Sequence, residues 1–101
     1  MLAELSIFPT DRGESGGQYV DEVVKYIKSE CGRKGIVYYT NSMSTLIEGE
    51  SKDVWEVLIS CHNIMRGSSN RYYSVIKIDE RKNMKDSIVG KKAKIERILG
   101  H

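Results

Sequence analysis

The feature that most constrains the fold is the order in which strand-like and helical spacing of apolar residues alternate along the chain. Residues 2–9 alternate with period two, and Pro9 ends this first strand because proline cannot donate a ladder hydrogen bond. Helical spacing follows. Ser15 and Gln18 have the spacing of a capping box, and one apolar stripe then continues to Cys31. The chain therefore opens with a strand and a helix.

The second half of the chain adds a hairpin, another helix and a final strand. Residues 36–40 and 44–50 are both strand-like, and the short polar segment between them predicts a turn. Helical spacing returns over residues 51–67, and residues 71–79 alternate again. From Ser87 onward the chain is helical in pattern, with a thin apolar stripe among basic residues.

The order strand-helix-strand-strand-helix-strand predicts an α+β fold, the ferredoxin-like βαββαβ sandwich, with a C-terminal helix added. Two helices should cover one face of a four-stranded antiparallel sheet and leave the other face open. The 101 residues are enough for one modest core, so we expect a single domain over residues 1–101.

Composition excludes few partners but favours a cytoplasmic setting. The formal charge of +2 requires neither nucleic acid nor a membrane. The first residues lack the pattern of a signal peptide, and no segment approaches the roughly 20 apolar residues of a membrane span. Only Cys31 and Cys61 are present, and both fall in helical patterns rather than in a disulfide framework.

The open sheet face is the predicted location of function. Alternation places the following residues toward the helices: Ala3, Leu5, Ile7, Ile76 and Ile78. It places these residues on the open face: Glu4, Ser6, Phe8, Val75, Lys77 and Asp79. Between residues 44 and 50 the facing is ambiguous, because Leu46 and Ile47 are adjacent and both apolar, so either Thr45 or Glu48 can join the open face. Apolar side chains beside charged ones suggest a face partly covered by another subunit.

The polar residues of these strands have two interpretations. They are Glu4, Ser6, Thr45, Glu48, Lys77 and Asp79. They form either a network of ion pairs between subunits or a pocket whose hydroxyls and carboxylates recognise an amino-substituted or cationic ring. No general base is predicted beside a nucleophile, which favours binding over catalysis.

Other motifs are weaker candidates. Cys61 and His62 are consecutive in a helical pattern and point about 100° apart, so we expect no metal site there and a surface position for the histidine. The glycines between residues 13 and 17 fit no phosphate-loop spacing, although a helix start can hold an anion. The basic C-terminal helix and the strand tyrosines raise RNA binding, but the ribonucleoprotein signature is missing.

Four segments resemble one known family, the thiamine-binding protein family of small stand-alone domains. They are Ala3–Pro9, Thr45–Glu50, Val54–Val57 followed by Cys61 and His62, and Ser74–Arg81. Their order and spacing agree over approximately residues 1–99. The resemblance implies a ferredoxin-like fold, dimers or tetramers assembled through the sheets, and non-catalytic binding of thiamine or its hydroxymethylpyrimidine portion.

The resemblance also implies ligand-binding roles for Ser6, Thr45, Glu48, Lys77 and Asp79. Ser6 and Thr45 are expected to hydrogen-bond the aminopyrimidine, and Glu48 or Asp79 to face its amino group or the thiazolium charge. Lys77 is expected to pair with one of those carboxylates. The competing hypotheses are a scaffold protein without a metabolite, an enzyme of thiamine salvage and an RNA-binding module.

Overall fold

The structure is a computed structural model that describes residues 1–11, 16–82 and 87–99. All the expected strands and helices are present, with ends that differ by a few residues from the predicted ones. The elements are β1 (Leu2–Pro9), α1 (Gly16–Lys34), β2 (Val37–Thr40), β3 (Thr45–Glu48), α2 (Ser51–Ser68), β4 (Tyr72–Asp79) and α3 (Ser87–Leu99).

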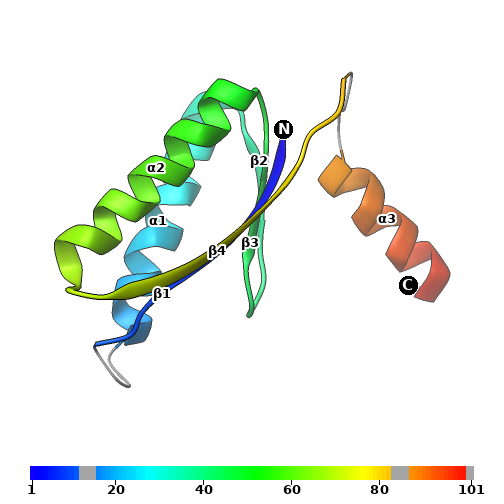
Figure 1. Cartoon of the computed structure of the whole chain (residues 1–101). Helices are drawn as coiled ribbons and strands as arrows, with labels where there is room; N and C mark the ends of the chain where they lie inside the picture. Colours follow the sequence, from blue (N-terminus) through cyan, green and yellow to red (C-terminus); the bar gives the residue numbers. More distant parts are fainter. Residues whose placement is uncertain (12–15, 83–86, 100–101) are drawn as a thin grey trace.

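The four strands form one antiparallel sheet in the order β2-β3-β1-β4, which confirms the ferredoxin-like sandwich. Helices α1 and α2 lie side by side on one face of the sheet, and α3 lies on the opposite side (Figure 1). Strand β1 pairs with β4 from Leu2 to Pro9 but with β3 only from Leu2 to Leu5. The second half of β1 therefore has a neighbouring strand on one side only.

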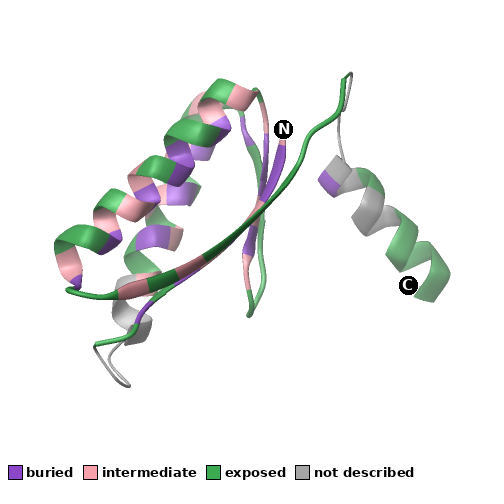
Figure 2. Cartoon of the chain, in the orientation of Figure 1, coloured by how far each residue is buried: buried purple, intermediate pink, exposed green. Residues whose placement is uncertain are grey.

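The core lies between the sheet and the two helices, as the purple segments on their facing sides show (Figure 2). The side chains expected to face the helices do so in β1, because Ala3, Leu5 and Ile7 are all buried. They pack against the apolar stripes of both helices, including Ile27 and Leu58. Burial of these stripes stabilises the helices more than local propensity does.

The structure shows where α1 and α2 end. The proposed cap at Ser15 lies outside the described residues. Helix α1 ends at Lys34, and Gly35 follows it with φ 70°, the left-handed conformation that glycine adopts without strain. Helix α2 runs to Ser68, one residue beyond the range 51–67 that helical spacing predicted, so Gly67 lies within the helix and does not end it.

The open face is partly covered by the start of α3. Ile88 is buried, and so is Leu2, which alternation places on this face. The rest of α3 extends away from the sheet and exposes Ile95, Ile98 and Leu99 (Figure 2). The open face is therefore closed at one end only.

Within the described part of the chain, no helix has the length and apolar character needed to cross a membrane. The same residues contain no group of three or more histidine, cysteine or carboxylate side chains arranged to hold a metal ion.

Candidate functional site

The structure divides the five predicted site residues between both faces and both ends of the sheet. In the β1–β3 register, Leu5 pairs with Thr45 and Leu2 with Glu48. Thr45 therefore lies on the helix face and is 6% exposed, whereas Glu48 lies on the open face and is 7% exposed. Ser6, Lys77 and Asp79 lie on the open face, as alternation predicted.

Ser6 and Thr45 both line a hollow of about 200 Å³. It lies at the Thr45 end of β3, which is called the end of β3 below. The hollow forms where β1 extends beyond β3, so side chains from both faces of the sheet can reach it. Its lining is apolar toward the core and polar toward the hairpin turn. The lining residues from α1 are Val20, Val23, Val24 and Ile27, and those from the hairpin are Thr40, Asn41, Ser42, Met43, Ser44 and Thr45.

The backbone of Ile7 adds a hydrogen-bonding edge to this hollow. Met1 and Gly49 exchange backbone hydrogen bonds of 2.8 and 3.1 Å, so the odd-numbered residues of β1 bond toward β3. Ile7 is also odd-numbered, but the pairing of β1 with β3 stops at Leu5, two residues before Ile7. Its N–H and C=O groups therefore point toward the hollow, where no described strand pairs with them.

The hydroxyl groups of the site have unused hydrogen-bonding capacity. The Oγ1 atoms of Thr40 and Thr45 are 3.1 Å apart, which uses one donor and leaves the other hydroxyl hydrogen free to bond elsewhere. The Ser6 hydroxyl has no hydrogen-bond partner among the described residues. Donors and acceptors are thus available at both walls of the hollow.

The hairpin turn that forms the rim is held by its own hydrogen bonds. The Asn41 side-chain oxygen accepts from the backbone N–H groups of Met43 and Ser44, at 2.8 and 2.9 Å. The Ser44 hydroxyl donates to the Glu4 carboxylate at 3.0 Å, which joins the turn to the open face of β1. These hydrogen bonds hold the rim in one conformation.

Glu48 lies at the opposite end of the sheet, in a second hollow of about 410 Å³. Its carboxylate accepts a hydrogen bond of 3.2 Å from the backbone N–H of Ile88, in the first turn of α3. A carboxylate at a helix start compensates the free N–H groups there. The contact explains the burial of Glu48 as an anchor for α3.

Lys34 occupies another part of the second hollow. Its ammonium group contacts Glu56 and lies 4.0 Å from Asp53. The hydrogen bond with Glu56 is the main reason that the pKa of Lys34 is raised above its ordinary value, with smaller contributions from the charges of Glu56, Asp53 and Glu30. Asp53 and Glu56 therefore have a lysine partner within the chain.

Lys77 pairs with a different carboxylate from the one predicted. Its ammonium group lies 3.7 Å from Glu4, its cross-strand neighbour, rather than beside Glu48 or Asp79. Side chains directly opposite each other on one face are the closest pairs in an antiparallel ladder. Lys77 and Asp79 line neither of the two hollows.

Sequence reasoning expected His62 at the surface, but the structure uses it as a bridge. Nδ1 lies 2.7 Å from the Leu58 carbonyl and Nε2 lies 2.9 Å from the Ser74 hydroxyl. A neutral ring with its proton on Nδ1 donates to the carbonyl and accepts from Ser74. His62 therefore links α2 to β4.

Neither thiol of the chain is placed for nucleophilic chemistry. Cys31 and Cys61 are free and fully buried. Burial raises the pKa of Cys31 to about 11 and that of Cys61 to about 12. Both therefore stay protonated near neutral pH, and the thiolate is the reactive form.

The sequence is similar to proteins of known family. A model of the thiamine-binding protein family matches residues 3–96, which is nearly the whole chain. The chain belongs to the thiamine-binding protein family. This confirms the resemblance of the four segments described above.

Curated relatives of this chain carry the name UPF0045 protein. MJ1052 of Methanocaldococcus jannaschii is 30% identical over 88 residues, 87% of this chain and 84% of the relative. YqgV of Bacillus subtilis is 29% identical over 102 residues, 99% and 95% of the two chains. Both similarities extend over most of the family domain.

Solved structures agree with the fold. The crystal structure of MJ1052 aligns with a TM-score of 0.79 over 93% of each chain, at 30% identity. TM0486 of Thermotoga maritima, named as a candidate for thiamine biosynthesis or salvage, aligns with a TM-score of 0.74 over 91% and 96% of the chains, at 15% identity. At that identity TM0486 supports the shared fold alone.

Sequence reasoning missed the Ile7 backbone as a part of the site. The turn at Asn41–Ser44 is visible in the sequence, but its place beside Ser6 depends on β3 beginning at Thr45, opposite Leu5. The hollow offers an apolar floor, two hydroxyl-bearing walls and a strand edge. That combination suits a small planar ring with polar atoms on its rim.

Proposed function

We propose that this protein binds thiamine, or its hydroxymethylpyrimidine moiety, in the hollow at the end of β3, without catalysing a reaction. One observation carries the proposal. Ser6 and Thr45, selected from the sequence as groups that bond an aminopyrimidine, line one hollow in a chain of the thiamine-binding family. The other three predicted residues lie elsewhere and are not part of the proposed site.

The size of the hollow supports entry of the pyrimidine ring alone. Sites for drug-sized ligands usually enclose about 300–1,000 Å³, whereas this one encloses about 200 Å³. The pyrimidine would contact the α1 valines, while the thiazolium ring of thiamine would remain at the mouth. Hydroxymethylpyrimidine would then keep most of the polar contacts that thiamine makes.

The polar atoms of the ring find complementary groups. An aminopyrimidine presents an amino donor next to a ring-nitrogen acceptor. The Ile7 C=O group can accept from the amino group, and the Ile7 N–H group can donate to the ring nitrogen. The hydroxyls of Ser6 and Thr45 can serve as donor or acceptor. A backbone edge reads such a pattern without needing a charged side chain.

Binding without turnover is part of the proposal. None of the described residues that line the hollow is a histidine or a carboxylate, and an activated hydroxyl needs an adjacent base. We further propose a cytoplasmic homo-oligomer, a dimer or tetramer. Tyr73 and Val75, 56% and 40% exposed, support association because they add to an apolar patch on the open face.

Calorimetric titration tests the function directly. Purified protein is titrated with thiamine, with hydroxymethylpyrimidine, and with the thiamine analogue whose pyrimidine amino group is replaced by oxygen. Saturable binding of the first two with clearly weaker binding of the analogue is expected, because the analogue reverses the donor pattern. Absence of heat with all three, from a folded protein, refutes the proposal and leaves a scaffold role as the better explanation.

A further inference from the structure

The hollow at the end of β3 continues onto the open face of the sheet. Ser6 and Phe8 line the hollow, although both side chains belong to the open face of β1. Glu4 precedes them on the same face, so three alternate residues of β1 form a row with about 7 Å between neighbours. The cross-strand partners of this row in β4 are Lys77, Val75 and Tyr73. These two rows together are called the shelf below.

The shelf has short side chains in its middle and long ones at both ends. Ser6 and Val75 form the middle, directly opposite each other. A charged pair stands at one end and two aromatic rings stand at the other. The Cα atoms of Glu4 and Phe8 are four residues apart in an extended strand, which corresponds to about 14 Å. That spacing leaves room for one small ring over Ser6, next to the hollow.

The charged end of the shelf offers a carboxylate to a cation. The Glu4 carboxylate accepts the Ser44 hydroxyl at 3.0 Å, and Ser44 lines the hollow, so this carboxylate is one hydrogen bond away from the wall of the hollow. Lys77 lies 3.7 Å from Glu4, but its side chain is 77% exposed and can turn into water. Exposed ion pairs of this kind contribute little to stability. A cation on the shelf can therefore replace the lysine as the partner of Glu4.

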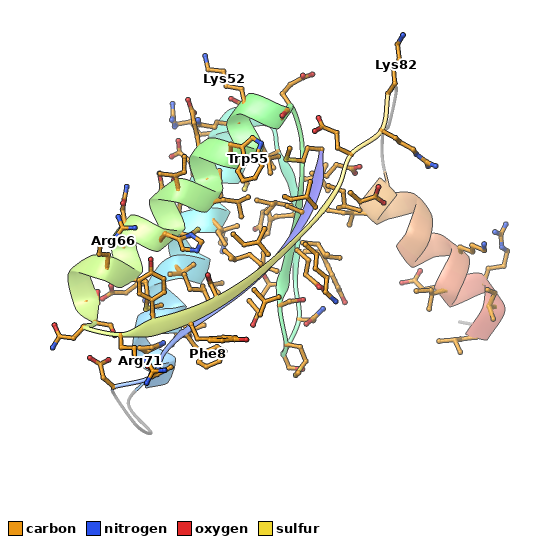
Figure 3. The ribbon with its side chains drawn as sticks, in the orientation of Figure 1. Phe8, Lys52, Trp55, Arg66, Arg71 and Lys82 are labelled. Atoms are coloured by element: carbon orange, nitrogen blue, oxygen red, sulfur yellow. The ribbon has the colours of Figure 1, made fainter. Side chains whose placement is uncertain are left out.

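The aromatic end of the shelf offers ring faces. Phe8 is 43% exposed, and its ring centroid lies 5.6 Å from that of Tyr73, with the two rings tilted by 38°. Figure 3 shows Phe8 beside β4, on the side away from α2. The face of an aromatic ring attracts cations, and flat cationic rings also stack on it. Both ends of the shelf therefore favour a positive charge between them.

We propose that the shelf binds the cationic thiazolium ring of thiamine, over Ser6 and between the Glu4 carboxylate and the Phe8 ring. The inference rests on the proposed function, because the pyrimidine ring must occupy the hollow. One methylene group joins the two rings of thiamine, so their sites have to be neighbours, as the hollow and the shelf are. The sequence assigned the thiazolium charge to Glu48 or Asp79, but the register places both toward the opposite end of the sheet, beside Leu2.

The shelf makes the site selective for charge. A neutral analogue of thiamine, with a thiophene in place of the thiazolium ring, has nearly the same shape but no positive charge. Opposite charges about 6 Å apart at a solvated surface correspond to a roughly three- to tenfold preference for thiamine over this analogue. Hydroxymethylpyrimidine lacks the second ring, so its affinity should not depend on Glu4. The charge of the ring and the binding of the pyrimidine can therefore be measured separately.

Calorimetric titration with these three ligands at low salt tests the assignment. Glu4→Gln removes the charge but keeps a side-chain oxygen that can accept from Ser44, so the rim is retained. This variant should lose the preference for thiamine over the neutral analogue and bind hydroxymethylpyrimidine as the wild-type protein does. Asp79→Asn is the matched control, because it changes the net charge equally at the opposite end of the sheet. The control should keep the full preference.

The aromatic end has its own test. Phe8→Leu keeps an apolar side chain but removes the ring face, so thiamine should bind roughly two- to fivefold more weakly while the neutral analogue loses less. Equal affinity of the wild-type protein for thiamine and the neutral analogue overturns the shelf while hydroxymethylpyrimidine binding upholds the proposed function. A preference that survives in Glu4→Gln but is lost in Asp79→Asn places the thiazolium ring elsewhere. Absence of binding by all three ligands overturns the function and the shelf together.

Discussion

Replacing Thr45 by valine isolates the hydroxyl that the proposed site depends on. Thr45 is 6% exposed in β3, and valine has nearly the same shape and β-branching, so the packing and strand propensity are retained. The substitution removes one hydroxyl, which lies 3.1 Å from that of Thr40. Thr40 is exposed and can bond water instead, so no buried group loses its partner.

The expected loss of binding free energy is the net contribution of one neutral hydrogen bond. That is about 0.5–1.5 kcal/mol, which corresponds to a roughly 2- to 13-fold increase in the dissociation constant for hydroxymethylpyrimidine. Calorimetry measures it, with Thr40→Val as the matched control. The control removes the neighbouring hydroxyl but leaves Thr45 free to bond the ligand, so its loss should be smaller.

Two results would refute this reasoning. One is a Thr45→Val variant that is folded and binds hydroxymethylpyrimidine as tightly as the wild-type protein. The other is a larger loss for Thr40→Val than for Thr45→Val. Oligomeric state should be unchanged in both variants, because both side chains lie on the helix face of the sheet and not on the open face.

Three further predictions concern stability. Ile27→Ala should lower the free energy of unfolding by about 2–5 kcal/mol through the cavity it leaves, and a change below 1 kcal/mol in urea titration would argue against its core position. His62→Ala should cost about 1–2 kcal/mol through the lost bridge to Ser74, whereas unchanged urea stability would show the bridge to be dispensable. Burial keeps Cys61 protonated in the folded state up to a pKa of about 12, while the unfolded thiol ionises near 9. Unfolding therefore releases a proton above pH 9, so stability should fall with rising pH by up to roughly 1.4 kcal/mol per unit for this thiol; a Cys61→Ala variant with the same alkaline slope would contradict it.

The sequence predicted the fold because each element has a clear period and a clear end. Alternation in β1 and β4 is regular, so the faces of Ser6 and Lys77 were predicted as observed. The predictions were less certain at β3, where Leu46 and Ile47 are both apolar. Leu46 is half-buried on the open face and Ile47 belongs to the core, so hydrophobicity alone cannot orient the strand.

Other features depend on register and strand length, which local patterns do not determine. The ion pair of Lys77 with Glu4 follows from their direct opposition across the ladder. The hollow exists because β3 ends four residues before β1 does. The role of Glu48 could not be predicted locally, because its carboxylate accepts from the backbone N–H of Ile88, forty residues later in the chain.

The central claim is that the hollow at the end of β3 holds the pyrimidine ring, and amide NMR during a hydroxymethylpyrimidine titration tests it most directly. Saturable shifts are expected for the Ile7 amide, whose N–H faces the hollow, and for the neighbouring amides of Ser6 and Thr45. Residues around Glu48 and Lys34, at the opposite end of the sheet, should stay unchanged. Saturable shifts confined to that opposite end, or to the open face around Lys77, would show that the ring binds elsewhere.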